Sequence, residues 1–309
     1  MKLLKLKKQE FLYFVMLSFV FVSTSALAIN KKAEIPKQLN SSSVKQSFSF
    51  PDNPVLGEHV SYPIISAQGV YAIDLDSGVP LYEKQVDTKL LPASTTKIIT
   101  ALVALDVYKL DQIIKIPAGV RVEGQKIGLY EGEEMSVENL LKALLIYSAN
   151  DSAEALARAY PYGRDAFINL MNIKASELNM YNSHFYNPAG LDGSEQYSTA
   201  KDLVRATEIA MKNPVFAEIV GTKEAIVTDV SGKNKYNLKN INKLLGTVDG
   251  VKGIKTGWTE NARENLVTYV ERNNHKVLIA LLGSSDRFGE TKELIDWIFG
   301  NYNWEEVKI

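Results

Sequence analysis

The stretch PASTTK, Pro92 to Lys97, places a serine and a lysine three positions apart where an apolar segment begins. The apolar residues that follow, through Tyr108, recur with the spacing of one helix face, which predicts a helix. Residues three apart share one face of a helix, so Ser94 and Lys97 would meet at its N-terminus, beside free backbone N–H groups. The serine can be a helix cap or a nucleophile with the lysine as base, and these six residues alone leave both open.

The S-x-x-K pattern occurs three times and is weak evidence by itself, because Ser and Thr commonly cap helices. One occurrence lies in a polar segment that offers no rigid scaffold, and another opens a polar helix where capping explains it. Only Ser94 follows a proline and a small residue and begins a strongly apolar helix. There a lysine whose pKa is lowered by burial and nearby cations could accept the serine proton. The three pairs are Ser42 with Lys45, Ser94 with Lys97, and Ser198 with Lys201.

Two further short motifs complement the first pair. YSAND supplies Ser148, which can relay a proton, and Asn150, which can bind a substrate amide. IKTGW supplies Lys255 and Thr256, which can hold a carboxylate, and Gly257, which lets substrate backbone approach a strand edge. Each motif alone is more simply a turn cap or a strand end. Together, the order S-x-x-K, S-x-N and K-T-G is a signature of penicillin-binding proteins and β-lactamases.

The predicted elements follow the order strands, helices, strands and a final helix. That order favours an α+β fold in which both ends of the chain build an antiparallel sheet, flanked by helices, with a helical subdomain inserted. Extended chain is expected around 112–122 and 127–135. The expected strands are 69–75, 79–85, 251–257, 264–272 and 275–284, and the expected helices are 94–109, 136–160, 164–178, 199–212 and 288–302.

The N-terminus predicts export from the cytoplasm. A basic segment, a short apolar core and the small residues Ala26 and Ala28 form the layout of a secretory signal over residues 1–28. Cleavage and retention as an N-terminal anchor both remain open, and the anchor would be the chain's only contact with a membrane. A polar segment at 29–65 indicates a flexible tether, followed by the folded domain at 66–303. The protein is therefore expected in an extracytoplasmic space, the periplasm or the cell-wall space.

Composition excludes several kinds of chemistry. The chain has no cysteine, so it has no disulfide, thiol nucleophile or Cys-based metal site. None of its 3 histidines lies in an H-E-x-x-H motif, and we predict no metal or organic cofactor. The formal net charge of −1 gives no reason to expect a nucleic-acid partner.

The flanks of the three motifs resemble those of the serine-type D-alanyl-D-alanine carboxypeptidases, the low-molecular-mass penicillin-binding proteins. The resemblance lies in LLPASTTKIITALVAL, LLKALLIYSANDSAEALA, VDGVKGIKTGWTENARENLV and the segment MNIKASELNMYNSHFYNPAGLDGSEQYSTAKDL, and it extends roughly over 66–302. It implies the β-lactamase/transpeptidase-like fold. It also implies release of the terminal D-Ala from peptidoglycan stem peptides ending in D-Ala-D-Ala, and acylation by β-lactam antibiotics.

The same resemblance implies a role for each motif residue. Ser94 would be the acylated nucleophile, Lys97 its general base, and Ser148 part of the proton relay. Backbone N–H groups of Ser94 and Trp258 would form an oxyanion hole. The implied substrate-binding residues are Asn150, Lys255, Thr256, Gly257 and Trp258.

The chain departs from the family pattern in two places. Many members carry a second, β-rich domain and a C-terminal anchor, whereas 52 residues follow Gly257 here, enough for two strands and a helix. We therefore expect no C-terminal β-rich domain. Many members also have a glycine near position 263, where this chain has Arg263, so strand geometry or substrate contacts are expected to differ there.

Three alternatives remain open. A class A β-lactamase needs a deacylating glutamate after the second motif, but Glu177 stands next to Leu178, and the E-x-x-L-N spacing of that class would place the glutamate at Ala175. A DD-endopeptidase acting on peptidoglycan crosslinks would use the same residues as a carboxypeptidase. A catalytically idle peptidoglycan-binding protein is disfavoured by the intact Ser94 and Lys97.

Overall fold

The structure, a computed structural model, describes residues 51–307. The predicted signal segment and the part of the predicted tether up to residue 50 lie outside the described residues. No helix within 51–307 is long and apolar enough to cross a bilayer.

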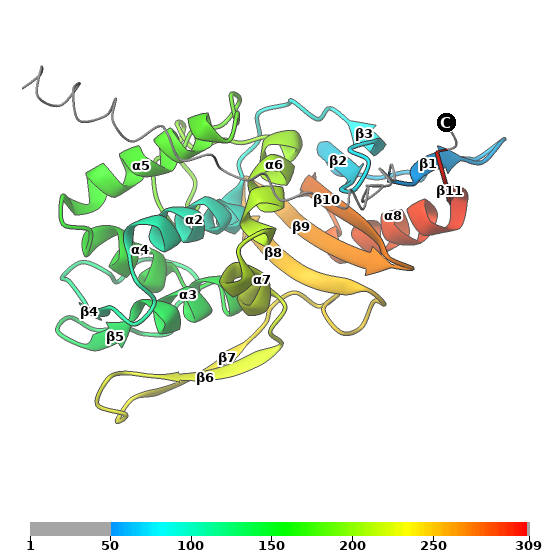
Figure 1. The fold of residues 1–309 in the computed structure, drawn as a ribbon. Coiled ribbons are helices and arrows are strands. Elements are labelled where there is room, and N and C mark those ends of the chain that lie inside the picture. The colour runs from blue at the N-terminus through cyan, green and yellow to red at the C-terminus, as the bar shows by residue number, and fades with distance from the viewer. Residues whose placement is uncertain (1–50, 308–309) are drawn as a thin grey trace, which may run out of the picture. The chain divides into compact units, whose positions relative to one another are not determined.

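A five-stranded antiparallel sheet forms the centre of the domain, and both ends of the chain contribute to it as predicted (Figure 1). Strands β10 and β9 lie inside the sheet, while β3 and β8 are its edges. In order across the sheet, the strands are β3 (Pro80–Lys84), β2 (Gly69–Asp74), β10 (His275–Ser284), β9 (Arg263–Arg272) and β8 (Val251–Thr259).

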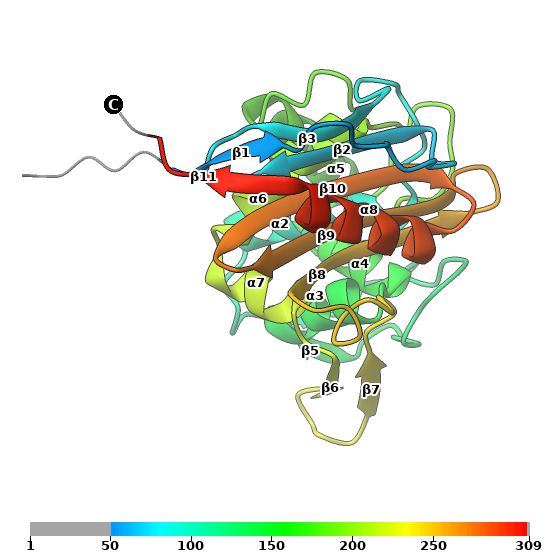
Figure 2. The same ribbon diagram turned by 90° about the vertical axis from the view of Figure 1, so that its right-hand side faces the viewer.

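Helices cover both faces of this sheet, which explains why β10 is apolar along nearly its whole length. Alternate residues of a strand point to opposite faces. Leu278 and its alternates join the core beneath the helical layer, whereas Ile279 and its alternates join a second core with Leu294 and Ile298 of α8 (Arg287–Asn301). Figure 2 shows α8 in front of the sheet and the other helices behind it.

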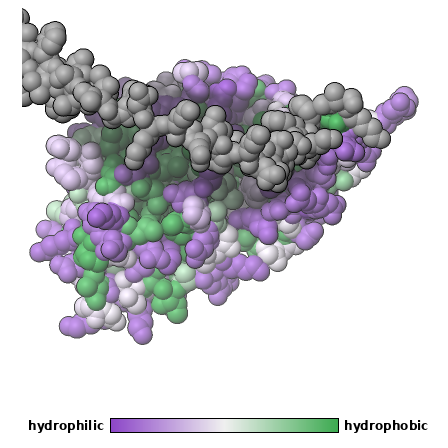
Figure 3. All heavy atoms as spheres, viewed as in Figure 1, coloured by the Kyte–Doolittle hydropathy of each residue, from purple (hydrophilic) through white to green (hydrophobic). Residues whose placement is uncertain are grey.

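The helical layer lies on one side of the sheet and carries two small two-stranded sheets (Figure 1). The hairpin of β6 and β7 projects away from the body, and neither it nor α7 was predicted from sequence. On the face seen in Figure 3, polar side chains dominate the outer parts and apolar side chains lie among the helices. The elements are α2 (Lys97–Val107), α3 (Val137–Ile146), α4 (Asn150–Arg158), α5 (Gly163–Glu177), α6 (Ala200–Met211), α7 (Pro214–Val220), β4 (Ile113–Lys115), β5 (Glu134–Ser136), β6 (Glu224–Thr228) and β7 (Lys235–Lys239).

The prediction of one continuous helix over 136–160 is wrong, because the chain forms two helices there. Helix α3 ends at Ile146 and α4 begins at Asn150. Between them Ser148 adopts φ 64°, in the left-handed region that a continuing right-handed helix excludes. The break lies at the second motif, so it decides where the side chains of that motif point.

The predicted boundary of the tether at residue 65 is also wrong. Residues 53–56 form β1 (Asn53–Leu56), which pairs with β11 (Tyr302–Glu305). The Ser61 carbonyl accepts a hydrogen bond from Trp297 Nε1 at 2.8 Å, and these two residues are 236 positions apart. The folded domain therefore starts before residue 66 and continues past residue 303. Local composition could not reveal this, because the partners come from the other end of the chain.

Candidate active site

Ser94 lies in a 3-10 turn, Ala93–Thr96, that leads directly into α2. The turn begins at Ala93 with φ 47°, a strained conformation for a residue with a Cβ. No side-chain hydrogen bond caps the turn or α2, so Ser94 is not a helix cap. Its neighbours Thr95 and Thr96 are buried, whereas Ser94 is partly exposed and lines a cleft. The geometry therefore favours the nucleophile over the cap.

Lys97 is completely buried on the first turn of α2 and points at Ser94. Its Nζ lies 2.8 Å from Ser94 Oγ, and it donates to Asn150 Oδ1 at 2.7 Å and to the Ala189 carbonyl at 2.6 Å. Burial, and secondarily the nearby charge of Lys255, hold the pKa of Lys97 well below its ordinary value. A neutral amine held this close to a hydroxyl can accept its proton.

Ser148 and Lys255 form a second hydroxyl–amine pair in the same site. Lys255 Nζ donates to Ser148 Oγ at 2.8 Å and to the Thr256 carbonyl at 3.0 Å. Burial, and secondarily the positive charge of Arg287, lower the pKa of Lys255 to about 7. The left-handed backbone of Ser148 lets this hydroxyl meet Lys255, because the chain ends one helix there and then starts the next.

Asn150, at the start of α4, connects the first pair to a neighbouring loop. Its Oδ1 accepts from Lys97, while its Nδ2 donates to the Glu123 carbonyl at 2.6 Å. Its backbone N–H donates to the Gln125 carbonyl at 2.7 Å. Each end of the side-chain amide therefore has one protein partner, which leaves one N–H and one lone pair to bind a substrate amide.

Two glycines let other segments approach the nucleophile turn closely. A Cβ on Gly257, in β8, would lie 3.0 Å from the Pro92 carbonyl oxygen and 3.2 Å from the Ser94 nitrogen. A Cβ on Gly190, at φ 84°, would lie 1.8 Å from the Ala93 carbonyl oxygen. The sequence predicted that Gly257 leaves room for substrate backbone. The structure gives a second reason for a glycine there, because the turn that carries Ser94 packs directly on this strand.

The motif residues converge on one cleft of about 570 Å³. Its lining includes Ser94, Ser148, Asn150, Thr256, Trp258 and Arg287. Lys97 and Lys255 are buried next to it, in hydrogen-bond contact with the two lining serines. Trp258 also lines this cleft, and its side chain is 62% exposed. The oxyanion-hole role implied for Trp258 concerns its backbone N–H and not this side chain.

Arg287 is a site residue that the motifs did not identify. It begins α8, and its Nη1 donates to the Gly257 carbonyl at 2.7 Å. Its Nε and the Oγ1 of Thr256 are buried without a hydrogen-bond partner among the described residues. Two unpartnered donors, one of them on a cationic side chain, suit a carboxylate. No short motif surrounds Arg287, although a cation just before the last predicted helix was visible in the sequence.

The residue at the departure from the family pattern, Arg263, has φ 60° at the turn from β8 to β9. Glycine adopts this conformation without the steric cost that other residues meet, which explains a family preference for glycine there. Arg263 is exposed and does not line the cleft. The departure therefore affects the conformation of the turn rather than the catalytic group.

The remaining candidate residues lie apart from this cleft. Ser42 is outside the described residues. Ser198 is buried and hydrogen-bonded to Ser183, while the cap of α6 is its neighbour Thr199, so the predicted cap is displaced by one residue. Glu177 forms a surface ion pair with Lys174 at 2.6 Å and does not line the cleft, which removes the candidate β-lactamase glutamate.

Comparisons with known proteins agree with this geometry. The family described as D-alanyl-D-alanine carboxypeptidase (Peptidase_S11) matches residues 57–286. The carboxypeptidase DacF of Bacillus subtilis is 32% identical over 80% of this chain, which spans 65% of that protein's length. The D-alanyl-D-alanine endopeptidase of Escherichia coli is 30% identical, with 77% of this chain and 79% of that protein covered.

Solved structures give the same result for the fold. The DD-transpeptidase of Streptomyces K15 superposes with a TM-score of 0.74 at 32% identity, covering 78% of this chain and 100% of that one. The sheet and helical layer described above are thus those of a penicillin-binding DD-peptidase. By its sequence, its fold and the match over residues 57–286, the chain belongs to the D-alanyl-D-alanine carboxypeptidase family.

Proposed function

We propose that this protein is a serine D-Ala-D-Ala carboxypeptidase that removes the terminal D-Ala from peptidoglycan stem peptides. One observation carries the proposal. The hydroxyl of Ser94 lies 2.8 Å from the amine of a fully buried Lys97, at the edge of an open cleft. A hydroxyl is a weak nucleophile until an adjacent base takes its proton, and this amine has the lowered pKa that such a base requires.

Binding precedes the chemistry. The terminal carboxylate of the peptide is held by Arg287, Thr256 and Lys255, which together place donors and positive charge on one side of the cleft. This arrangement aligns the carbonyl carbon of the penultimate D-Ala with Ser94. The backbone N–H groups of Ser94 and Trp258 donate to the carbonyl oxygen and stabilise the negative charge that develops on it.

In acylation, Lys97 takes the hydroxyl proton while Ser94 Oγ bonds to the carbonyl carbon. The C–N bond then breaks, and the leaving amine of D-Ala receives a proton from Lys255 through the hydroxyl of Ser148. A donor with a pKa of about 7 is suited to this transfer near neutral pH. In deacylation, water adds to the ester and gives its proton to Lys255, and Lys97 returns the proton to Ser94.

We expect β-lactams to acylate Ser94, because they resemble D-Ala-D-Ala. A second candidate activity is endopeptidase cleavage of peptidoglycan crosslinks, which would use the same residues. A relative from Escherichia coli is named D-alanyl-D-alanine endopeptidase. The substrate places the reaction outside the cytoplasm, in agreement with the signal predicted over residues 1–28.

The test is intact-protein mass after incubation of residues 29–309 with benzylpenicillin, beside Ser94→Ala and Ser198→Ala. Ser198 is the matched control because it has the same S-x-x-K spacing but is buried against Ser183. We expect a stable adduct on the wild type and on Ser198→Ala, and none on Ser94→Ala. An adduct that survives in Ser94→Ala would disprove the assignment, and rapid drug turnover without a lasting adduct would indicate a β-lactamase.

A companion assay separates the two peptidase activities. The protein is given a monomeric pentapeptide ending in D-Ala-D-Ala and, separately, a crosslinked dimer of stem peptides. Release of D-Ala from the monomer is expected to exceed cleavage of the dimer. The reverse preference would replace the carboxypeptidase assignment with the endopeptidase one.

A further inference from the structure

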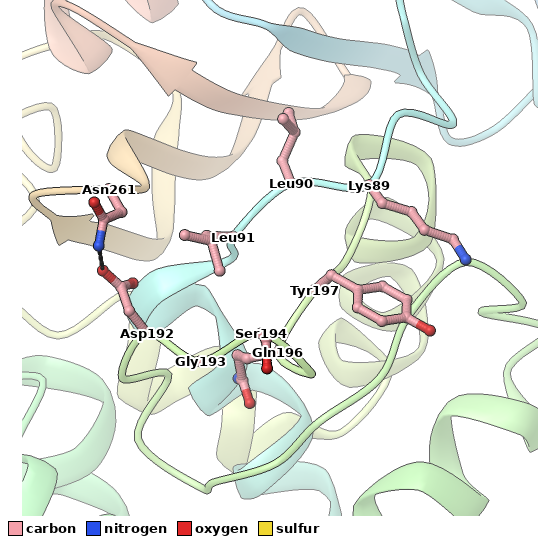
Figure 4. A pocket seen from close by; sticks show the side chains of 9 residues that line it. All are labelled: Lys89, Leu90, Leu91, Asp192, Gly193, Ser194, Gln196, Tyr197 and Asn261. Carbon is pink, nitrogen blue, oxygen red and sulfur yellow. Dashed lines mark hydrogen bonds between the residues drawn. The ribbon is translucent and has the colours of Figure 1, made fainter.

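A second cavity of about 650 Å³ lies beside the catalytic cleft and has no part in the mechanism above. Figure 4 shows its lining: the Asp192 and Asn261 side chains on one side, Lys89 and Tyr197 on the other, and Leu91 between them. The cavity is comparable in size with the catalytic cleft of about 570 Å³. It is therefore large enough to hold several residues of a peptide.

A hydrogen-bonded bridge marks the border between the two spaces. The Asp192 carboxylate accepts from Thr259 Oγ1 at 2.7 Å and from Asn261 Nδ2 at 3.0 Å. Thr259 lines the catalytic cleft, whereas Asn261 and Asp192 line the second cavity. The two spaces are thus neighbours on either side of one side-chain bridge.

The path from the nucleophile to this cavity is short. β8 passes the nucleophile turn at Gly257 and reaches the bridge at Thr259, two residues later. On the other wall, Leu91 precedes Ser94 by three residues, so their Cα atoms are at most about 11 Å apart. Three extended peptide residues span about 10 Å. A peptide that runs from Ser94 along the free edge of β8 is therefore long enough to meet the cavity within three residues.

The far side of the cavity carries a positive charge. Lys89 Nζ lies 4.6 Å from the centroid of the Tyr197 ring, over its face. Lys89 is exposed and forms no salt bridge within residues 51–307. The cavity therefore presents apolar surface from Leu91, the Asp192 carboxylate on the side of the catalytic cleft and the Lys89 ammonium group on the far side. An acidic group of a bound peptide would be attracted to the Lys89 end and kept away from Asp192.

We propose that the second cavity binds the part of the substrate peptide upstream of D-Ala-D-Ala, and that Lys89 pairs with the carboxylate of an acidic residue there. The inference rests on the proposed function, since it concerns the substrate of the same site. It makes Lys89 a specificity-determining residue that acts on binding and takes no part in bond breaking.

The test compares substrates that differ in one group. The probes are diacetyl-Lys-D-Ala-D-Ala, which ends before the cavity, the pentapeptide Ala-γ-D-Glu-Lys-D-Ala-D-Ala, and the same pentapeptide with the free glutamyl carboxylate converted to an amide. The proteins are the wild type, Lys89→Ala, Lys89→Glu and Lys239→Glu. Lys239 is the matched control because it is exposed on the β6–β7 hairpin and lines neither space.

For the carboxylate pentapeptide, we expect kcat/KM to fall about threefold in Lys89→Ala and about tenfold in Lys89→Glu, as for a partly exposed ion pair lost or reversed. The difference should shrink as salt is raised, because salt screens exposed charges. For the amide pentapeptide and the tripeptide, and for every substrate with Lys239→Glu, kcat/KM should change less than about twofold.

The inference is overturned if Lys89→Glu lowers kcat/KM equally for acid and amide, or for neither. Failure of the proposed function looks different. In that case the wild type fails to release D-Ala from the tripeptide and to form a penicillin adduct at Ser94. Activity on the tripeptide with no dependence on Lys89 therefore refutes the second cavity alone.

Discussion

The two lysines of the candidate active site, Lys97 and Lys255, are both almost completely buried but have different surroundings. Lys97 lies at the start of a helix, contacts Ser94 Oγ and two other oxygen atoms, and faces the charge of Lys255. Lys255 sits in an edge strand, donates to two acceptors and faces Arg287. Burial lowers the pKa of both, to about 7 for Lys255. In the proposed mechanism Lys97 is the base because it contacts Ser94, and Lys255 is the proton donor because it contacts Ser148.

Each lysine is also paired with a serine next to, or within, strained backbone. Ser94 follows Ala93 at φ 47°, and Ser148 itself has φ 64°. Such conformations persist only when the surrounding structure enforces them. For the turn that carries Ser94, this support includes Gly190 and Gly257, which both pack against it.

The largest effect is expected from removing the amines one at a time. Lys97→Met should slow acylation by benzylpenicillin by about 10³-fold, as for the loss of a general base. Lys255→Met should slow it by about 10- to 100-fold, because substrate anchoring and the relay are lost while the base remains. Stopped-flow acylation rates measure both, with thermal unfolding as a control for folding. If Lys255→Met is the more damaging variant, the two roles are reversed.

The next effect comes from the two glycines that pack against the turn that carries Ser94. Gly190→Ala should reduce acylation by about 100-fold and lower Tm, because its φ is positive and its Cβ would lie 1.8 Å from the Ala93 carbonyl oxygen. Gly257→Ala should cost about tenfold, since its contacts start at 3.0 Å and a small shift relieves them. Equal losses from the two variants would argue that one rigid turn, rather than two separate supports, holds Ser94.

A pH profile tests the assignment of the two protonation states. Acylation should increase as pH rises through the lowered pKa of Lys97, because only the neutral amine accepts a proton. It should decrease above about pH 7, where Lys255 loses its proton. In Lys255→Arg the decrease near pH 7 should disappear, since arginine stays protonated, and the rate should be lower at every pH, since arginine cannot give up a proton. A decrease near pH 7 that persists unchanged in Lys255→Arg would contradict the assignment.

The lowered pKa of Lys255 should also make the stability of the folded protein depend on pH. Lys255 in the folded protein binds a proton less readily than in the unfolded chain, so between about pH 7 and 10 the unfolded state holds more protons. The free energy of unfolding should therefore rise with pH in that window, by about 1.4 kcal/mol per pH unit from this group. Denaturant unfolding of the wild type against Lys255→Met checks this, and parallel curves would disprove it.

The smallest effect concerns the turn that follows the Lys255 strand. Arg263→Gly should raise the free energy of unfolding by up to about 1 kcal/mol, because glycine relieves the positive φ without touching either lysine. Lys239→Gly, in the regular strand β7, is the control and should lower stability by about 0.5–1 kcal/mol. The acylation rate of Arg263→Gly should stay unchanged. A changed rate would show that the conformation of this turn affects the catalytic site.

Much of the candidate site was predictable because most of its residues belong to three short sequence motifs. Ser94 and Lys97 are neighbours in the chain, and their spacing on a helix start follows from local sequence. The strands at both ends and most helices were predictable for a similar reason, since their apolar periodicity is local. The three motifs in order indicated the family, and the match over residues 57–286 confirms it.

Other features depended on contacts between distant segments. Lys97 meets Asn150 and Ala189 across 53 and 92 positions, and Lys255 meets Ser148 across 107. Arg287 belongs to no motif, and β1 pairs only with the far end of the chain. Nothing in local composition distinguishes such residues from ordinary surface or tether residues.

The sequence by itself therefore determined which groups could react and the class of protein to which they belong, because residue type and spacing set the available acids, bases and donors. Only the tertiary structure decided which of those groups meet, which lysine contacts Ser94, and that a second cavity with Lys89 adjoins the cleft. The physical reason is that burial and neighbouring charge set a pKa, and both arise when distant segments pack together.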